Sequence, residues 1–243
     1  MKKIWHFLLE HLRINKILEK QDKIFRLQTE VLYAHRFNNT IIDSYWLKYQ
    51  NFSPGGWAVD YGMLYTLYRV LNGVKPKHIL EFGLGQSSKM IHQYADYYQT
   101  EAVTCEHDDQ WIHFFNEGRD GDYIIMIQKM ELETIMYKGM ETLTYKDIDK
   151  FVGEKKFDFI LVDGPYGSEH FSRSQIVDIA RNNLLPSFCI IIDDTEREGE
   201  QEIIQEVISV LKSSEIQYCC CEYSASKKHT LICSQDYKFL TTL

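Results

Sequence analysis

The sequence lacks a hydrophobic run long enough to span a membrane. Its start imitates a signal peptide, because apolar residues between Ile4 and Leu9 follow two lysines, but Glu10, His11 and Arg13 then interrupt them. The run falls far short of both the apolar core of a signal peptide and the roughly 20 residues of a membrane-spanning helix. We therefore expect a cytoplasmic protein without a transmembrane segment.

Positive charge is also scarce, since 27 Lys and Arg stand against 35 Asp and Glu and the formal net charge is −8. This balance argues against a nucleic-acid partner, because phosphate binding depends on clustered basic side chains. The six cysteines lack the paired spacing of a zinc site and fall mostly in predicted strands. We interpret them as small apolar core residues in a reducing compartment, in preference to disulfide or metal use.

With 243 residues, 44% of them hydrophobic, the chain is long enough for one sizeable core and an appended segment. From Ile4 to about Tyr33, apolar residues recur with helical spacing and predict one or two amphipathic helices. We interpret these helices as a cap on the main domain or as a homodimer contact. Lys2, Lys3 and Trp5 slightly favour the alternative of an interfacial membrane helix. The chain is predicted to divide into two parts. Residues 1–56 form an N-terminal helical extension that serves as a lid or dimerisation segment, and residues 57–243 form one domain.

The most informative stretch is His78 to Ser88, where a short apolar run breaks into a glycine-rich turn and then into a helical pattern. Gly83 and Gly85 lack a Cβ, so they tolerate positive φ and let a ligand lie directly on the backbone. Ser87 and Ser88 suit the first turn of the helix that follows, whose free N–H groups would face that ligand. The stretch therefore predicts a strand, a tight turn and a helix N-terminus.

Acidic residues end the next predicted strands. Glu106 follows the apolar run at 102–105 and lies 25 positions after Glu81 (106 − 81), close to the spacing at which an acid binds ribose hydroxyls. Such an acid argues against a ligand with a 2′-phosphate. Two further buried runs, at 157–162 and 189–192, end in Asp163 and in Asp193 and Asp194. These strands deliver their acids to one edge of a sheet.

The rest of the chain continues the alternation of helices and strands. Helices are predicted at 60–71, 89–97, from 110 to 115, and at 145–152, 171–183 and 198–211. The third strand is predicted at 123–127, and residues 131–145 predict an extra hairpin. The tail holds two strand patterns, at 216–223 and 229–233, whose short connector favours an antiparallel hairpin because parallel strands need a long crossover.

In this order the residues resemble a class I S-adenosylmethionine (SAM) dependent methyltransferase, from about Lys75 to the C-terminus. The run at 81–85 resembles that family's first motif, Glu106 its ribose-binding acid, and the run at 158–165 its fourth motif at the active-site edge. The resemblance implies an α/β fold with an open, doubly wound, mostly parallel seven-stranded sheet and a reversed C-terminal strand. It also implies SAM as the cofactor, and the expected cofactor-binding residues are Glu81, Gly83, Gly85, Ser87, Ser88, Glu106, His107 and Asp163.

A narrower, partial resemblance is to catechol-type O-methyltransferases, in which acids after the fourth and fifth strands bind magnesium. It implies a Mg²⁺ site at Asp163, Asp193 and Asp194, and hard carboxylate oxygens suit such an ion. The alternative is that Asp194 caps the next helix and Asp193 is a solvated strand end. The sequence departs from this branch at Tyr166, where the branch has its catalytic lysine.

The expected catalytic residues are Asp163, Tyr166 and His170. Asp163 follows the fourth strand and should border the reacting methyl group, because ligands of open α/β sheets lie over the carboxyl ends of the strands. His170 is suited to proton transfer by its unperturbed pKa of about 6.5, and the alternative is a surface histidine without a catalytic role. In the same loop, Arg173 would hold an anionic or phosphate group.

We predict a SAM-dependent methyltransferase that acts on a small-molecule or glycan acceptor, at oxygen. Enzymes that methylate amino groups of nucleic acids and proteins typically have an Asn-Pro-Pro-aromatic tetrapeptide after the fourth strand, and this sequence has none there. The glycan acceptor is motivated by the aromatic-rich N-terminal half, since aromatic faces stack on sugars. Two other classes stay open. One is an NAD-dependent oxidoreductase, because dinucleotide-binding proteins share the glycine turn. Their glycine fingerprint has a third glycine, however, and Ser88 stands at that position here. The other is a non-catalytic nucleotide-binding Rossmann protein.

Overall fold

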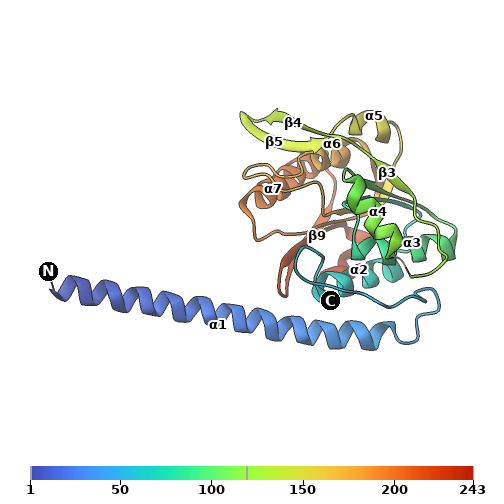
Figure 1. Cartoon of the computed structure of the whole chain (residues 1–243). Coiled ribbons are helices and arrows are strands. Elements are labelled where there is room, and N and C mark those ends of the chain that lie inside the picture. Colours follow the sequence, from blue (N-terminus) through green and yellow to red (C-terminus); the bar gives the residue numbers. More distant parts are fainter. Residues whose placement is uncertain (1, 119, 243) are drawn as a thin grey trace.

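The central strands are apolar on both faces, so the sheet that they form is buried on both sides. The computed structural model describes residues 2–118 and 120–242 (Figure 1). Its seven-stranded sheet has the order β3-β2-β1-β6-β7-β9-β8. The strands are β1 (His78–Phe82), β2 (Glu101–Glu106), β3 (Ile127–Lys129), β6 (Phe157–Val162), β7 (Leu184–Ile192), β8 (Tyr218–Ser224) and β9 (Lys228–Ser234). The first five pair in parallel and β9 is antiparallel to β7 and β8, which confirms the predicted sheet.

Neighbouring residues of one strand enter two different hydrophobic cores. In β6, Phe159 and Leu161 belong to the core covered by α2 (Tyr61–Val74), α3 (Gln86–Tyr98), the end of α1 and the 3₁₀ helix η1 (Gln235–Thr242). Ile160 and Val162 belong to the core covered by α5 (Ile148–Val152), α6 (Gln175–Asn182) and α7 (Glu198–Ser213). The short helix α4 (Asp109–Glu117) connects β2 to β3. This alternation explains the continuous apolar runs in the sequence.

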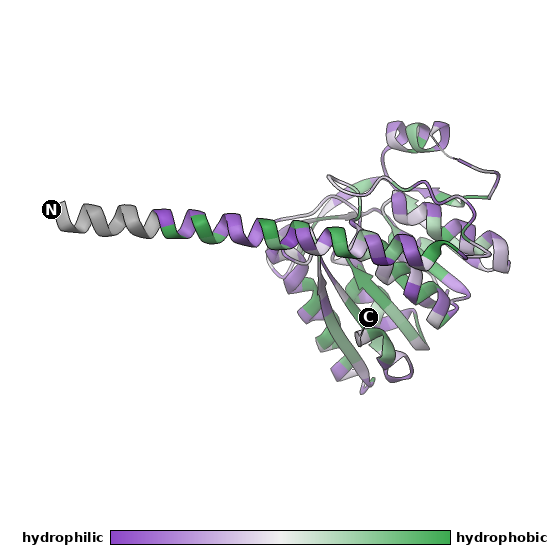
Figure 2. Cartoon of the chain, turned by 90° about the horizontal axis from the view of Figure 1, so that it is seen from below, coloured by the Kyte–Doolittle hydropathy of each residue, from purple (hydrophilic) through white to green (hydrophobic). Residues whose placement is uncertain are grey.

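The N-terminal segment forms one helix, α1 (Lys2–Ile41), which extends beyond the predicted end near Tyr33. Its last turns are held because Tyr33, Phe37 and Ile41 are buried in the first core. The rest of α1 projects away from the sheet (Figure 1), with apolar and polar patches along it (Figure 2). Side chains up to residue 12, among them the predicted interfacial Trp5, lie outside the part that the structure describes. Within that part, the helices are too short or too polar to cross a membrane.

The third strand begins later than predicted. It starts at Ile127 instead of residue 123, because the ring of Tyr123 packs on Tyr49, with centroids 5.8 Å apart, while Ile124 and Met126 are exposed. Parallel pairing with β2 therefore starts only at Ile127.

The predicted extra hairpin is present as a separate sheet of β4 (Leu132–Tyr137) and β5 (Met140–Tyr145). It supports the loop after β6, since the backbone N–H of Leu143 donates to Ser168 Oγ at 2.9 Å and Thr142 Oγ1 donates to the Phe171 carbonyl at 2.9 Å. In this loop Phe171 and Arg173 have φ of 45° and 62°, values outside the helical region. Helix α6 consequently begins after them and not at residue 171 as predicted.

Candidate functional site

The turn between β1 and α3, residues 83–85 (the glycine turn), lies against the end of β6. Gly83 has φ of +93°, and a Cβ there would lie 2.7 Å from the backbone oxygen of Asp163. Gly85 faces open space, because no described atom lies within 4 Å of a Cβ built on it. Its N–H donates to Ser88 Oγ at 2.9 Å, which holds the start of α3. The backbone at Gly85 is thus open to a ligand at a helix N-terminus.

Glu81 lies behind the glycine turn and is fully buried. Its two oxygens accept hydrogen bonds from Ser87 Oγ at 2.6 Å and Thr104 Oγ1 at 2.5 Å. Thr104 Oγ1 is also 2.8 Å from Nε2 of His92. Burial raises the pKa of Glu81 to about 7, although the hydroxyl donors oppose this shift. Glu81 therefore ties β1 to β2 and to the first turn of α3, and it acts on the site through Ser87.

Glu106, the acid at the end of β2, meets the glycine turn directly. Its Oε2 accepts the N–H of Leu84 at 3.0 Å, and its Oε1 accepts the N–H groups of His107 at 2.6 Å and Asp108 at 3.0 Å. From the first turn of α4, the indole N–H of Trp111 donates to the Leu84 carbonyl at 2.7 Å. Leu84 is thus held on both sides. Sequence reasoning missed Trp111, although its place in the first turn after the ribose-type acid was a usable signal.

Two other predicted site residues, His107 and Tyr166, pack against each other. Their rings meet edge to face with centroids 4.7 Å apart. Nδ1 of His107 lies 2.8 Å from Oε1 of Glu106, while Tyr166 is 56% exposed. The contact joins the loops that follow β2 and β6, so the structure brings these two residues to the same edge as the glycine turn.

The acid cluster comprises Asp163 after β6 and Asp193 and Asp194 after β7. One oxygen of each lies within 4.8 Å of the others. Asp193 is only 1% exposed, so the alternative of a solvated strand end is wrong, and its oxygens have no hydrogen-bond partner among the described residues. Burial raises the pKa of Asp193 well above its ordinary value and raises that of Asp163 to about 6, where Arg173 opposes the shift.

Three basic side chains reach the same acids. Nη2 of Arg173 is 3.1 Å from Asp194 Oδ2 and 3.6 Å from Asp163 Oδ1. Nη1 of Arg197 is 2.9 Å from Asp194 Oδ2, and Nζ of Lys227 is 3.5 Å from Asp194 Oδ1. Arg173 is 3% exposed, so its guanidinium group faces these acids. The prediction that it holds an external anion is therefore wrong. A divalent ion would lie among like charges here, and the residues present do not fit the predicted Mg²⁺ site.

The described contacts of His170 are to α7 and not to the acid cluster. Its Nδ1 is 3.1 Å from Glu202 Oε1 of α7, and this acid raises the pKa of the His170 ring. The neighbouring N–H of Phe171 donates to Oε2 of the same glutamate at 2.8 Å. The described contacts of His170 thus attach its loop to α7.

The connector between α1 and α2 covers the start of α3. Gln93 binds the backbone of Tyr49 at both its N–H (2.8 Å) and its carbonyl (3.0 Å), and the N–H of Ser53 donates to Gln86 Oε1 at 3.1 Å. Further along, the Trp57 carbonyl accepts a bond from Lys227 Nζ at 3.5 Å. The connector therefore passes beside both the glycine turn and the acid cluster.

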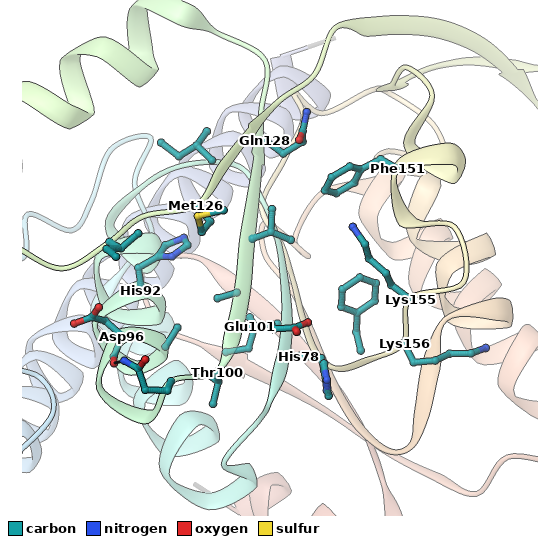
Figure 3. Close-up of a pocket in the computed structure, with 18 of the residues that line it drawn as sticks. His78, His92, Asp96, Thr100, Glu101, Met126, Gln128, Phe151, Lys155 and Lys156 are labelled. Atoms are coloured by element: carbon teal, nitrogen blue, oxygen red, sulfur yellow. Dashed lines mark hydrogen bonds between the residues drawn. The ribbon is translucent and has the colours of Figure 1, made fainter.

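A cavity of about 910 Å³ lies toward the opposite ends of the strands. It is lined by His78 and Glu101, which begin β1 and β2, and by His92, Met126, Phe151 and Lys155 (Figure 3). In an open α/β sheet, ligands bind outside the carboxyl ends of the strands. We therefore place the candidate site at the glycine turn and the acid cluster.

No protein-family model and no curated protein matches the sequence. Among solved structures, the chain is similar to the S-adenosylhomocysteine (SAH)-bound methyltransferase PaMTH1 of Podospora anserina, with a TM-score of 0.50, 15% identity, and coverage of 86% of this chain and 88% of that chain. It is also similar to a methyltransferase from Pyrococcus furiosus, with a TM-score of 0.45, 16% identity, and coverage of 86% and 97%. At 15% identity, the similarity to PaMTH1 shows a shared fold and nothing finer. It confirms the predicted class I methyltransferase fold.

Proposed function

We propose that this protein transfers a methyl group from SAM to an oxygen atom of a small-molecule or glycan acceptor. The observation that carries the proposal is the junction of Glu106 with the glycine turn at the carboxyl ends of two adjacent parallel strands. Such a junction suits an adenosine, because an acid that binds ribose stands beside a backbone that a ligand can approach. The shared fold with an SAH-bound methyltransferase supports SAM over other nucleotides.

Glu106 retains capacity for a ribose hydroxyl. A carboxylate offers about four acceptor positions, and the described backbone N–H groups use one on Oε2 and two on Oε1. We assign the free position on Oε2 to the ribose, with Gly83 and Gly85 providing close backbone approach. Ser87 and Ser88 hold the helix N-terminus in place, and His107 flanks the adenosine.

SAM supplies an electrophilic methyl group on its sulfonium. The residues of this chain must then hold the acceptor oxygen in line with that group and take up its proton. We assign the acceptor to the loop after β6, where Asp163 keeps 18% of its side chain exposed and Tyr166 is open to solvent. His170 stays a weaker candidate for the proton acceptor, because its described partner is Glu202 of α7.

Calorimetric titration with SAM, SAH and NADH tests the cofactor. We expect saturable binding of SAM and SAH, and a loss of at least about 1.4 kcal/mol, a factor of ten, in Glu106→Ala. Glu117→Gln, on the exposed end of α4, is the matched control and should bind as the wild type does. Binding of NADH without SAM or SAH would contradict the proposal in favour of the oxidoreductase. After binding is established, methyl transfer from labelled SAM to phenols and to sugars identifies the acceptor.

We further propose that α1 forms a homodimer with a second copy of this helix. Eight apolar side chains between residues 14 and 32 are 52–67% exposed: Ile14, Ile17, Leu18, Ile24, Phe25, Leu27, Val31 and Leu32. Most of them repeat every seven residues in two adjacent columns, 17-24-31 and 18-25-32. A seven-residue apolar repeat keeps one stripe of a helix facing a partner helix along its length. Charges of both signs flank it, so two copies do not repel.

Sedimentation equilibrium tests the dimer. Ile24→Asp places a charge in the seam and should convert the protein to a monomer. Asn15→Asp adds the same charge on the polar face of α1 and should leave the dimer intact. A wild-type monomer that floats with anionic vesicles would instead support the interfacial membrane helix.

A further inference from the structure

Both oxygens of Asp194 are already in contact with positive charge. Oδ2 lies 3.1 Å from Nη2 of Arg173 and 2.9 Å from Nη1 of Arg197, and Oδ1 lies 3.5 Å from Nζ of Lys227. The Asp194 carboxylate is 5% exposed and the Arg173 side chain 4%, so this ion pair is shielded from water and salt, whereas Arg197 is 46% exposed. A metal ion bound at Asp194 would have to share each oxygen with one of these groups.

Arg173 is fixed in this position by the backbone. Its Nε donates to the Pro165 carbonyl at 3.2 Å and its Nη1 to the Asp193 carbonyl at 3.2 Å, at the ends of β6 and β7. A guanidinium group does not lose its proton in proteins. Arg173 therefore supplies a permanent positive charge between the two strand ends that carry the acid cluster.

Lys227 reaches the cluster from a distant part of the chain. It lies in the turn between β8 and β9, and its backbone N–H donates to Asp60 Oδ2 at 2.8 Å. Oδ1 of Asp60 accepts the N–H of Met63 at the start of α2. The turn is thus anchored to a core helix, and the Lys227 side chain keeps only 16% of its surface exposed. This ammonium group is the cation nearest to Oδ1 of Asp194 in the described contacts.

We propose that Arg173 and Lys227 take the place of a divalent cation in the acid cluster, with Lys227 excluding the metal from Asp194. This inference rests on the proposed function only in its consequence, which is that methyl transfer runs without a metal ion. The physical reason is that a divalent ion within bonding distance of Asp194 is repelled by the adjacent ammonium and guanidinium groups. Oδ1 of Asp194 has the ion pair with Lys227 but no hydrogen-bond partner among the described residues, and neither do the oxygens of Asp193. Removing the ammonium therefore leaves these oxygens available together as metal ligands.

Titration of the full-length protein with Mn²⁺, followed by the electron paramagnetic resonance signal of the free ion, tests this. Wild-type protein should leave the signal unchanged up to about 1 mM Mn²⁺, and Lys227→Met should bind Mn²⁺ at least about tenfold more tightly. Lys227→Arg keeps the charge and should behave as wild type. Lys228→Met is the control at the next residue, the first of β9, because Lys228 pairs with Glu222, at 2.8 Å. Asp194→Asn added to Lys227→Met should abolish the gained binding.

Mn²⁺ binding to the wild type as tight as to Lys227→Met would overturn the inference, and so would a Lys227→Met variant that gains no binding. Circular dichroism of each variant shows whether it is folded. SAH affinity is measured separately, with EDTA and with Mg²⁺, and should be the same in both. Because Mn²⁺ binding needs no SAM, absence of SAH binding would contradict the proposed function and leave the metal result standing.

Discussion

The backbone N–H of Leu84 donates to Oε2 of Glu106 at 3.0 Å, so the acid that ends β2 holds the turn that follows β1. The indole N–H of Trp111 donates to the carbonyl of the same residue, Leu84. Two hydrogen bonds within the protein therefore fix the glycine turn at Leu84. Preorganisation of this kind lowers the entropy that binding must overcome.

We expect Trp111→Phe to weaken SAH binding by about 1 kcal/mol, or roughly fivefold, because phenylalanine keeps the ring but cannot donate to the Leu84 carbonyl. Calorimetry measures the effect. Trp57→Phe is the matched control, since Trp57 is 92% exposed and its hydrogen bond to a described residue is made by its backbone carbonyl. Equal affinities of the two variants would show that the Trp111 bond does not contribute.

Gly83→Ala should destabilise the protein by about 2–4 kcal/mol, because the new Cβ combines a positive φ with a clash. That Cβ would lie 2.7 Å from the backbone oxygen of Asp163. Gly139→Ala is the control, with a φ of +86° but no described atom within 4 Å, and should cost only about 1–2 kcal/mol. Urea unfolding gives both values, and equal losses would argue against the close approach of Gly83 to the backbone of Asp163.

The buried Glu81 should make stability depend on pH. Its pKa is about 7 in the folded protein against a model-compound value of 4.5, so between these pH values the folded state binds more protons than the unfolded state. Its contribution to the free energy of unfolding is therefore present at low pH and lost as pH rises through this window. In Glu81→Gln the side chain does not titrate, so its contribution to the free energy of unfolding does not fall as pH rises. Relative to wild type, the variant should gain up to about 3 kcal/mol between pH 4.5 and 7.

Urea unfolding at pH 4.5 and 7 measures this difference. Asp163 also has a raised pKa. Because it is present in both proteins, its contribution to the pH dependence largely cancels in the difference between them. Glu133→Gln, on the exposed face of β4, should track the wild type at both pH values. A Glu81→Gln difference that stays constant with pH would contradict the raised pKa.

Two boundaries were beyond sequence reasoning because the folded chain sets them, one through a contact with a remote residue and one through the backbone conformation of a loop. The start of β3 depends on Tyr123 packing against Tyr49, 74 positions away in the sequence (123 − 49). The start of α6 depends on the positive φ values of Phe171 and Arg173, which no local pattern indicates.

By itself, the sequence determined the order of strands and helices, the glycine turn and the acids at or near the ends of β1, β2, β6 and β7. It did so because parallel strands buried on both faces require continuous apolar runs, and polar residues mark where those runs end. Only the tertiary structure decided what those acids contact. Antiparallel pairing of β9 with β7 brings Lys227 onto Asp194, 33 positions away (227 − 194), and the ends of β6 and β7 close around Arg173. Charge compensation between residues so far apart depends on distances in space, which spacing along the chain does not contain.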